Sequence, residues 1–217
     1  MNCSASIKVR ILAAPTPPPP FVGSRFVVQT EPEQLIWGIN EATLAEGRES
    51  GTVDWGDGTT ETVAGITRLT HEYSSPGVYE VRLSDDFATL RMSMTVTQTV
   101  FAKTYAPMVL EFHTNAVNLS ELLAGHLNNA LKLRTLEVLA RNMKLMTNNT
   151  YNGCAALTGE VSFPYIENLS NLEPFKNCTG LTVIHFSKAS EEAITANQVY
   201  LKDPTLGSQN ARVDFDL

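Results

Sequence analysis

The sequence predicts a mainly β protein with some helix, divided into two β-rich parts of different kinds. Tight-turn signals between alternating runs fill the first half, whereas a 24-residue repeat fills the second. The length of 217 residues allows one large or two small domains. We therefore expect an N-terminal arm and proline-rich spacer over residues 1–21, a β-sandwich over 22–98, and a repeat region with a C-terminal cap over 99–217.

The arm combines a short alternating run with a proline cluster. Residues 7–12 alternate apolar and basic side chains, which favours an edge strand. The prolines of residues 15–20 favour a stiff polyproline II spacer, and a ligand for a proline-reading domain is the alternative. The apolar piece at residues 11–14 is too short for a signal-peptide core. On this interpretation the chain acts inside a cell, reaches the outside by assembly, lysis or another route, or is a processed or mis-started reading frame.

Strand signals follow one another through the first half. Composition predicts strands at residues 26–30, 34–39 and 87–96, with a loop at residues 40–50. Between them, Gly56-Asp57-Gly58 and Pro76-Gly77 predict tight turns. Alternate side chains of a sandwich strand point inward, which predicts these core residues: Trp37, Trp55, Tyr79, Val81 and Phe87.

The residues around these two turns resemble the PKD domain, an immunoglobulin-like β-sandwich. That family carries a tryptophan, Gly-Asp-Gly-Thr, a tyrosine and Pro-Gly-x-Tyr-x-Val. The matching residues here are Trp55, Gly56 to Thr59, Tyr73, and Pro76 to Val81. The resemblance covers roughly residues 22–98 and implies a PKD-like sandwich.

The second half contains the repeat. Leu127, Tyr151 and Phe175 are spaced 24 residues apart, and the same spacing relates Ala130, Cys154 and Cys178 as well as Leu133, Leu157 and Leu181. A fixed period in the twenties is typical of a solenoid, in which each turn of the chain buries its apolar ladder against the next. We expect the three leucines to form one hydrophobic column.

An aromatic residue, Asn-Cys, a leucine and a short apolar strand resemble the BspA-like leucine-rich repeats. Residues 175–184 match best, residues 151–163 match with one extra residue, and the units near residues 127 and 103 are weaker. The resemblance implies a short leucine-rich-repeat solenoid. Helix formers at residues 121–127 and 131–146 predict helical turns on its convex side. Residues 190–194 predict a helix start, and residues 211–215 a last strand.

Composition and motifs exclude several classes of function. The net charge of −7 argues against nucleic acid and anionic lipid as partners. No apolar run is long enough to span a bilayer. The three cysteines form no disulfide framework or zinc pair, and the four histidines show no metal-ligand spacing. Nothing matches a nucleophile elbow, a P-loop or a dinucleotide fingerprint. The Asn-x-Ser/Thr sequences at Asn2, Asn118, Asn148, Asn168 and Asn177 are interpreted as chance occurrences.

Four residues near the turns are candidates for a catalytic or calcium-binding role. Asp54 and Asp57 lack a partner base and a dense calcium-binding ladder, so we expect Asp57 to cap its own turn. His71 has no nucleophile motif near it, and Tyr73 is expected to be a buried tyrosine bonded to backbone. We therefore assign no catalytic, cofactor-binding or metal-binding residue and expect a protein that is not an enzyme.

The repeat offers two further candidates. Cys154 and Cys178 would lie about 4.8 Å apart on adjacent coils, near enough for a disulfide, although two buried thiols are favoured because stacked side chains point the same way. Asn129 and Asn177 are expected to bond backbone at the turn of the coil.

Both resemblances imply modules that display protein-binding or glycan-binding surfaces on bacterial exteriors. The expected function is a non-enzymatic binding or adhesion module at the cell surface or outside it, with a protein or glycan ligand and an oligomer allowed. One alternative is a structural component of a phage or other particle, located in the virion. The other is a carbohydrate-binding accessory module of an enzyme system. The concave sheet face of the repeat is the first expected binding surface, followed by the loops at one end of the sandwich.

Overall fold

The structure is a computed structural model that describes residues 20–65, 67–92, 105–147, 149–170, 173–198, 200 and 203–217. The expected arm strand, the proline cluster up to residue 19, Cys3 and the end of the strand expected at 87–96 lie outside the described residues.

Strands dominate the described residues. Those of the first half are β1 (Gly23–Thr30), β2 (Ile36–Leu44), β3 (Gly51–Asp54), β4 (Thr60–Val63), β5 (Thr67–Glu72), β6 (Gly77–Ser84) and β7 (Phe87–Arg91). Those of the second half are β8 (Val109–Thr114), β9 (Glu121–Leu122), β10 (Thr135–Val138), β11 (Leu145–Met146), β12 (Thr158–Phe163), β13 (Asn168–Leu169), β14 (Gly180–Phe186) and β15 (Arg212–Phe215). The helical elements are η1 (Ala106–Met108), η2 (Lys188–Ser190) and α1 (Glu191–Ala196). The mainly β prediction is confirmed.

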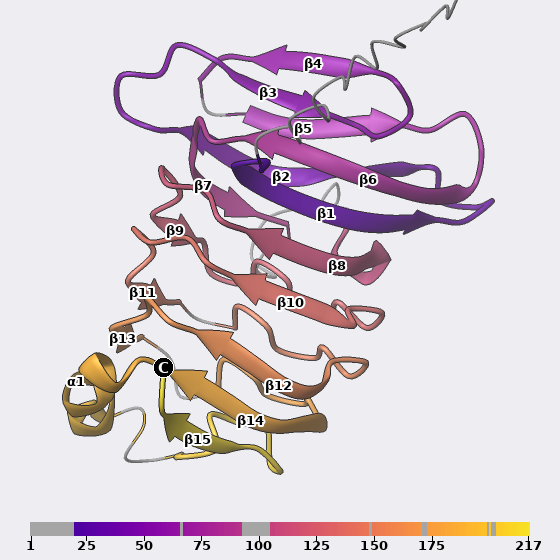
Figure 1. The fold of residues 1–217 in the computed structure, drawn as a ribbon. Coiled ribbons are helices and arrows are strands. Elements are labelled where there is room, and N and C mark those ends of the chain that lie inside the picture. The colour runs from indigo at the N-terminus through magenta and orange to yellow at the C-terminus, as the bar shows by residue number, and fades with distance from the viewer. Residues whose placement is uncertain are drawn as a thin grey trace, which may run out of the picture.

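In the first half two sheets face each other (Figure 1). One runs β4-β3-β6-β1 and the other β5-β2-β7, with antiparallel pairing throughout. The indole of Trp37 on β2 meets the ring of Phe26 on β1 at a centroid distance of 5.5 Å, so side chains from both sheets share one core. Gly56 and Gly58 adopt φ values of +79° and +93°, which explains why the turn after Trp55 requires glycine.

Two expectations about this half need correction. Residues 40–44 belong to β2 rather than to a loop, because they pair with β7 from Glu41↔Arg91 to Leu44↔Phe87. Four of the five expected core residues are buried, but Tyr79 is only partly buried. Its hydroxyl donates to the carbonyl of Ser75 at 2.8 Å, near the surface.

In the second half the chain coils, and successive coils pair in parallel. Thr135 of β10 pairs with Glu111 of β8, an offset of 24 residues, and β12, β14 and β15 continue the parallel stack (Figure 1). At the opposite corner of the coil, the amide of Tyr151 donates to the carbonyl of Pro174 at 3.1 Å, 23 residues away. The expected leucines, Leu133, Leu157 and Leu181, are all buried in one cluster. The 24-residue repeat in the sequence therefore corresponds to a repeated pattern of backbone hydrogen bonds between successive coils.

The helical turns expected at residues 121–127 and 131–146 are wrong. These ranges hold β9, β10, β11 and non-helical turns. Their backbone groups bond to neighbouring coils, as when the amide of Leu139 donates to the carbonyl of Thr114 at 2.7 Å, and this pairing outweighs local helix propensity. The helix start near residue 190 and the last strand near residue 212 are confirmed by α1 and β15.

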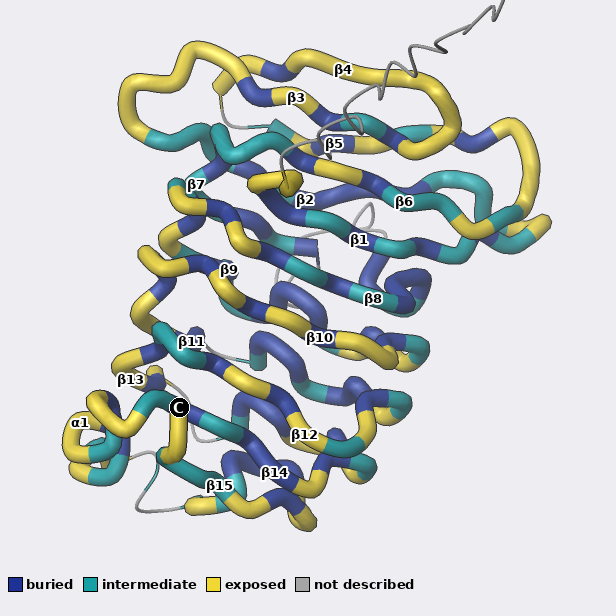
Figure 2. Tube along the Cα trace, viewed as in Figure 1, coloured by how far each residue is buried: buried dark blue, intermediate teal, exposed yellow. Residues whose placement is uncertain are grey.

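The two halves are joined through their sheets. β8 pairs antiparallel with β1, with Phe26 opposite Phe112, and β9 pairs parallel with β7. One six-stranded sheet, β10-β8-β1-β6-β3-β4, therefore crosses the expected boundary at residue 98. The buried side chains of both halves form one cluster, and Figure 2 shows buried positions continuing from the first half into the second. The division into domains stays a prediction.

Candidate functional site

Charged side chains that contact one another gather on one face of the six-stranded sheet and on the same side of the separate β12-β14-β15 sheet. Strand alternation sends Phe26, Phe112 and Phe186 into the core, so their neighbours Arg25, His113 and His185 point to the opposite side. We call this side the outer face and define it by these residues: Arg25, Glu80, Arg82, Glu111, His113, Glu137, Glu160, His185, Arg212, Asp214 and Asp216.

A chain of five ionisable side chains crosses four strands of the outer face. Arg25 on β1 lies 3.0 Å from Glu80 on β6 and 3.6 Å from Glu111 on β8. Glu111 is 3.3 Å from Nε2 of His113, whose Nδ1 is 3.1 Å from Glu137 on β10. The network joins residues from both halves of the sequence. Partly exposed pairs of this kind contribute only about 0–1 kcal/mol each, so their main effect is to fix side-chain positions.

A small pocket of about 210 Å³ opens beside this network. Arg25, His113 and Glu137 supply its polar wall, and Phe21 and Leu139 supply its apolar wall. Ligand pockets for drug-sized molecules usually enclose about 300–1,000 Å³. This pocket therefore suits one side chain or one sugar ring of a larger ligand.

The side chain of Asn115 holds the backbone around Phe21 at the pocket. Its Nδ2 donates to the carbonyl of Phe21 at 2.9 Å, and its Oδ1 accepts from the backbone amide of Gly23 at 3.0 Å. Gly23 has a φ of +148°, and a Cβ there would lie 2.2 Å from the carbonyl oxygen of Leu83. Only glycine allows this approach. The guanidinium carbon of Arg82 lies over the Phe21 ring, 5.6 Å from its centroid, which is within the distance of a cation–π contact.

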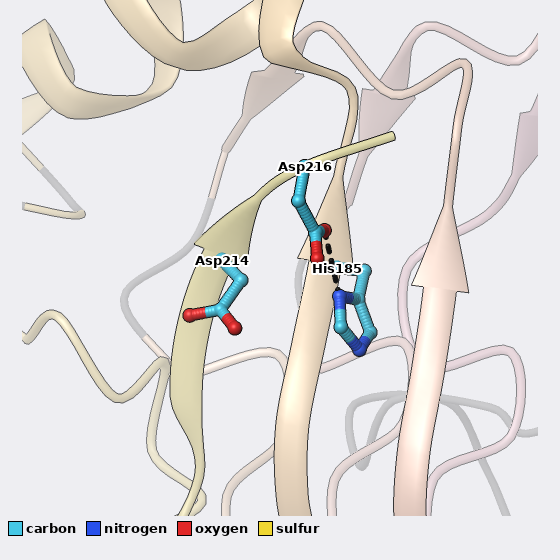
Figure 3. Close-up of side chains that lie close together, drawn as sticks. All are labelled: His185, Asp214 and Asp216. Carbon is cyan, nitrogen blue, oxygen red and sulfur yellow. Dashed lines mark hydrogen bonds and ion pairs between the residues drawn. The ribbon is translucent and has the colours of Figure 1, made fainter.

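A second group of charges lies at the far end of the outer face, on β14 and β15. His185 is hydrogen-bonded through Nδ1 to Asp216 at 2.7 Å (Figure 3). Its Nε2 faces Glu160 at 3.3 Å. Asp214 lies beside them and accepts from Nε of Arg212 at 2.9 Å and 3.1 Å. Partial burial lowers the pKa of His185, but Asp216 and Glu160 outweigh it, so the pKa is raised overall.

The residues expected near the turns have structural partners. Asp57 accepts from the amide of Thr59 at 3.0 Å, which confirms the expected cap, and its other oxygen is 2.7 Å from Nε2 of His71. The hydrogen bond from the Thr59 side chain, with smaller contributions from His71, lowers the pKa of Asp57 to about 2. The buried hydroxyl of Tyr73 donates to the carbonyl of Trp55 at 3.0 Å, as expected, and burial raises its pKa.

Cys154 and Cys178 are free, buried thiols, as the sequence favoured. Each donates to a backbone carbonyl of the preceding coil, Cys154 to Leu127 at 3.4 Å and Cys178 to Tyr151 at 3.0 Å. The neighbouring Cys178 thiol and burial raise the pKa of Cys154 well above its usual value. The hydrogen bond with Cys154 lowers the pKa of Cys178 instead, against the effect of burial. A thiol held in its protonated form is a poor nucleophile, so Cys154 is unreactive, and both buried side chains contribute to packing.

The asparagines of the repeat share a backbone conformation. Asn129 and Asn177 have φ values of +60° and +62°, and Gly153, at the equivalent position of the middle coil, has +78°. The backbone amide of Asn129 donates to the carbonyl of Asn152 on the next coil at 2.7 Å, as the amide of Gly153 does to the carbonyl of Lys176 at 2.7 Å. Bonding of the Asn129 and Asn177 side chains to backbone stays a prediction. Asparagine and glycine tolerate the left-handed conformation better than other residues, which explains their recurrence at this corner.

His126 is a buried ionisable side chain that contacts both halves of the chain. It is fully buried, and its ring lies 5.2 Å from Phe112 and 6.1 Å from Phe26. Neither ring nitrogen has a well-formed hydrogen bond. Burial lowers its pKa to about 3 against a weak opposing interaction with the backbone of Leu90. The imidazole is therefore neutral at physiological pH and acts as a core side chain.

Sequence spacing did not reveal the outer face. The four histidines looked scattered, yet His113 and Glu137 are one repeat period of 24 residues apart and sit in register on β8 and β10. The 24-residue offset between His113 and Glu137 is the signal in the sequence that places the two side chains on neighbouring strands. The pairing of Arg25 with His113 needs the β1–β8 contact, for which the sequence gives no local signal.

Comparison with protein-family models, with curated proteins and with solved structures finds no match to this chain. No helix among the described residues is long and apolar enough to cross a membrane.

Proposed function

We propose that the protein is a non-enzymatic binding module, with a PKD-like sandwich and a BspA-like leucine-rich-repeat region that together present the outer face to a ligand on a bacterial exterior. The observation that carries the proposal is the ion-pair network from Glu80 to Glu137, which extends across both halves on one sheet. A continuous, ordered, polar surface suits an extended ligand better than a free metabolite.

The pocket next to the network limits which chemical groups of a ligand can bind there. Its volume of about 210 Å³ fits a single ring. The exposed ring of Phe21 offers an apolar platform, and the Glu137 carboxylate, held by Nδ1 of His113, offers an acceptor beside it. These are the groups that one sugar of a glycan or one polar side chain of a protein would use.

A glycan array with labelled protein tests the glycan form of this proposal. We expect the wild type to bind a subset of glycans and the double variant His113→Ala/Glu137→Gln to lose at least tenfold in signal. Glu49→Gln is the matched control, because it also removes a carboxylate but lies in an exposed loop outside the outer face. A wild type that binds no glycan, or a control that loses as much as the double variant, would reject a glycan ligand at this pocket.

The structural component of a particle is the alternative function. It is favoured by the outermost strands, since β4 and β15 each pair on one side only among the described residues. Open edges can pair with another chain. Light scattering over a range of protein concentrations tests it: concentration-dependent assembly would support the particle role, and a monomer at all concentrations would reject it.

A further inference from the structure

We propose that His185, Asp214 and Asp216 form a binding site for a divalent transition-metal ion such as Zn²⁺ at the β14–β15 end of the outer face. The inference concerns a different part of the molecule from the pocket and does not depend on the proposed binding function.

Backbone pairing brings the three side chains together. β14 and β15 run parallel with His185 directly opposite Asp214. Asp216 follows two residues later, so its side chain emerges on the same face as that of Asp214. The amide of Leu217 donates to the carbonyl of Phe186 at 3.4 Å, and the amide of Lys188 donates to the carbonyl of Leu217 at 3.1 Å. The backbone on both sides of Asp216 is therefore tied to the end of β14.

The ligand atoms are close enough for one ion. One nitrogen of His185 and one oxygen from each aspartate all lie within 4.8 Å of one another, and Figure 3 shows the three side chains grouped on one side of the sheet. Two ligands of a tetrahedral Zn²⁺ are about 3.3 Å apart, given bond lengths of about 2.0–2.1 Å. Small side-chain rotations close the remaining gap without moving the strands.

The donor set and the local charge favour such an ion. One imidazole nitrogen with two carboxylates is a common ligand combination for Zn²⁺ and related ions. Carboxylates of Glu160 and Asp216 contact the imidazole of His185, and that of Asp214 lies beside it and contacts Arg212. The Arg212 side chain is 68% exposed, so it can leave Asp214 for solvent when a cation binds.

Glu160 supplies an independent indication. Metal-binding histidines usually donate their second N–H to a carboxylate, which fixes the tautomer and orients the ring. Glu160 already faces Nε2 of His185 at 3.3 Å, whereas Asp216 contacts the other ring nitrogen, Nδ1, at 2.7 Å. With Nδ1 as the metal ligand, Nε2–H donates to Glu160.

His113 provides a matched comparison within the same protein. It too sits between two carboxylates on the outer face, but Glu111 and Glu137 lie against different ring nitrogens, at 3.3 Å and 3.1 Å. They cannot converge on one ion. Among the described residues, the His185 group is the only set of three potential ligands that meets the distance condition.

Isothermal titration of the full chain with ZnCl₂, in a Cys3→Ser background and a non-chelating buffer, tests the site. We expect one equivalent to bind with a micromolar dissociation constant. His185→Ala and Asp216→Asn should each weaken binding at least tenfold, Glu160→Gln should weaken it about tenfold, and His113→Ala should leave it unchanged.

Thermal unfolding of each metal-free variant checks that the fold is retained, which these surface changes should allow. Absence of Zn²⁺ binding by the wild type would overturn the proposal. So would equal affinity in His185→Ala, or an equal loss in His113→Ala. The outcome is separable from that of the glycan experiment, because the residues whose loss should weaken zinc binding lie on β12, on β14 and next to β15, whereas the pocket variant changes residues on β8 and β10.

Discussion

Acid should destabilise this protein through His126, and replacing that residue by leucine should remove the effect. The side chain is fully buried between Phe26 and Phe112, and burial lowers its pKa to about 3. In the unfolded chain a histidine has a pKa of about 6.5. Between these two values the unfolded state binds a proton that the folded state does not.

The direction and size of the effect follow from linkage. Because the folded-state pKa is depressed, the stability difference is fully present above about pH 6.5 and is lost as the pH falls towards 3. Each pH unit in this window costs about 1.4 kcal/mol, so the loss from about pH 7 to about pH 4.5 is about 2.5 kcal/mol. That is a large part of the stability of a typical domain.

The assay is urea unfolding of the wild type and His126→Leu at both pH values. Other ionisable groups are the same in the two proteins, so their contributions cancel in the comparison. We expect the wild type to lose about 2.5 kcal/mol more than the variant, with unchanged m-values. If both proteins lost the same free energy of unfolding on acidification, the buried, neutral assignment of His126 would be refuted.

Three further predictions concern the turns and the ladder. Gly153→Ala should destabilise the protein by about 1–3 kcal/mol, because φ is +78° and the new Cβ would lie 2.5 Å from Oδ1 of Asn129. Asn177→Gly, at the equivalent corner, should change the free energy of unfolding by less than about 0.5 kcal/mol. Equal losses of the two variants in urea titrations would contradict this. Tyr73→Phe should cost about 1–2 kcal/mol in the same assay, because it removes the buried hydrogen bond to Trp55; an unchanged midpoint would show that the bond contributes nothing. In a Cys3→Ser background, Cys154 and Cys178 should react with Ellman's reagent only after unfolding, because both are buried; rapid reaction of the native protein would contradict their placement.

The sequence predicted the elements that depend on local signals. The Gly56-Asp57-Gly58 turn, the burial of Trp55 and the Tyr73 hydrogen bond follow from glycine chemistry and alternation. The 24-residue period predicted that successive coils pack against one another and that the three leucines are buried together, and the parallel pairing of β8 with β10 at this offset agrees with it. Each of these features is encoded within a short stretch or by a fixed spacing.

The errors arise where distant pairing decides the structure. Helix formers at residues 131–146 lie in β10, β11 and turns because their backbone groups bond to adjacent coils. The extension of β2 to Leu44 depends on β7. The outer face needs two long-range pairings, β1 with β8 and β14 with β15, and neither has a local signal. The candidate site was therefore outside the reach of spacing arguments, although the residues themselves were visible.

The claim on which the rest depends is that β1 and β8 are neighbours, so that one sheet spans both halves. Disulfide cross-linking tests this most directly, using Arg25→Cys with His113→Cys in a Cys3→Ser background. These two residues are register partners on the outer face. Partners in an antiparallel pair have Cα atoms about 4.5–5.5 Å apart, within the range of a disulfide.

The control pair is Arg25→Cys with Glu137→Cys, since β10 lies one strand beyond β8. Its Cα atoms are about 10 Å apart, too far for a disulfide. After mild oxidation and peptide mapping, the account predicts a nearly complete cross-link for residues 25 and 113 and little for residues 25 and 137. Equal yields for the two pairs, or no cross-link between residues 25 and 113, would contradict a continuous sheet.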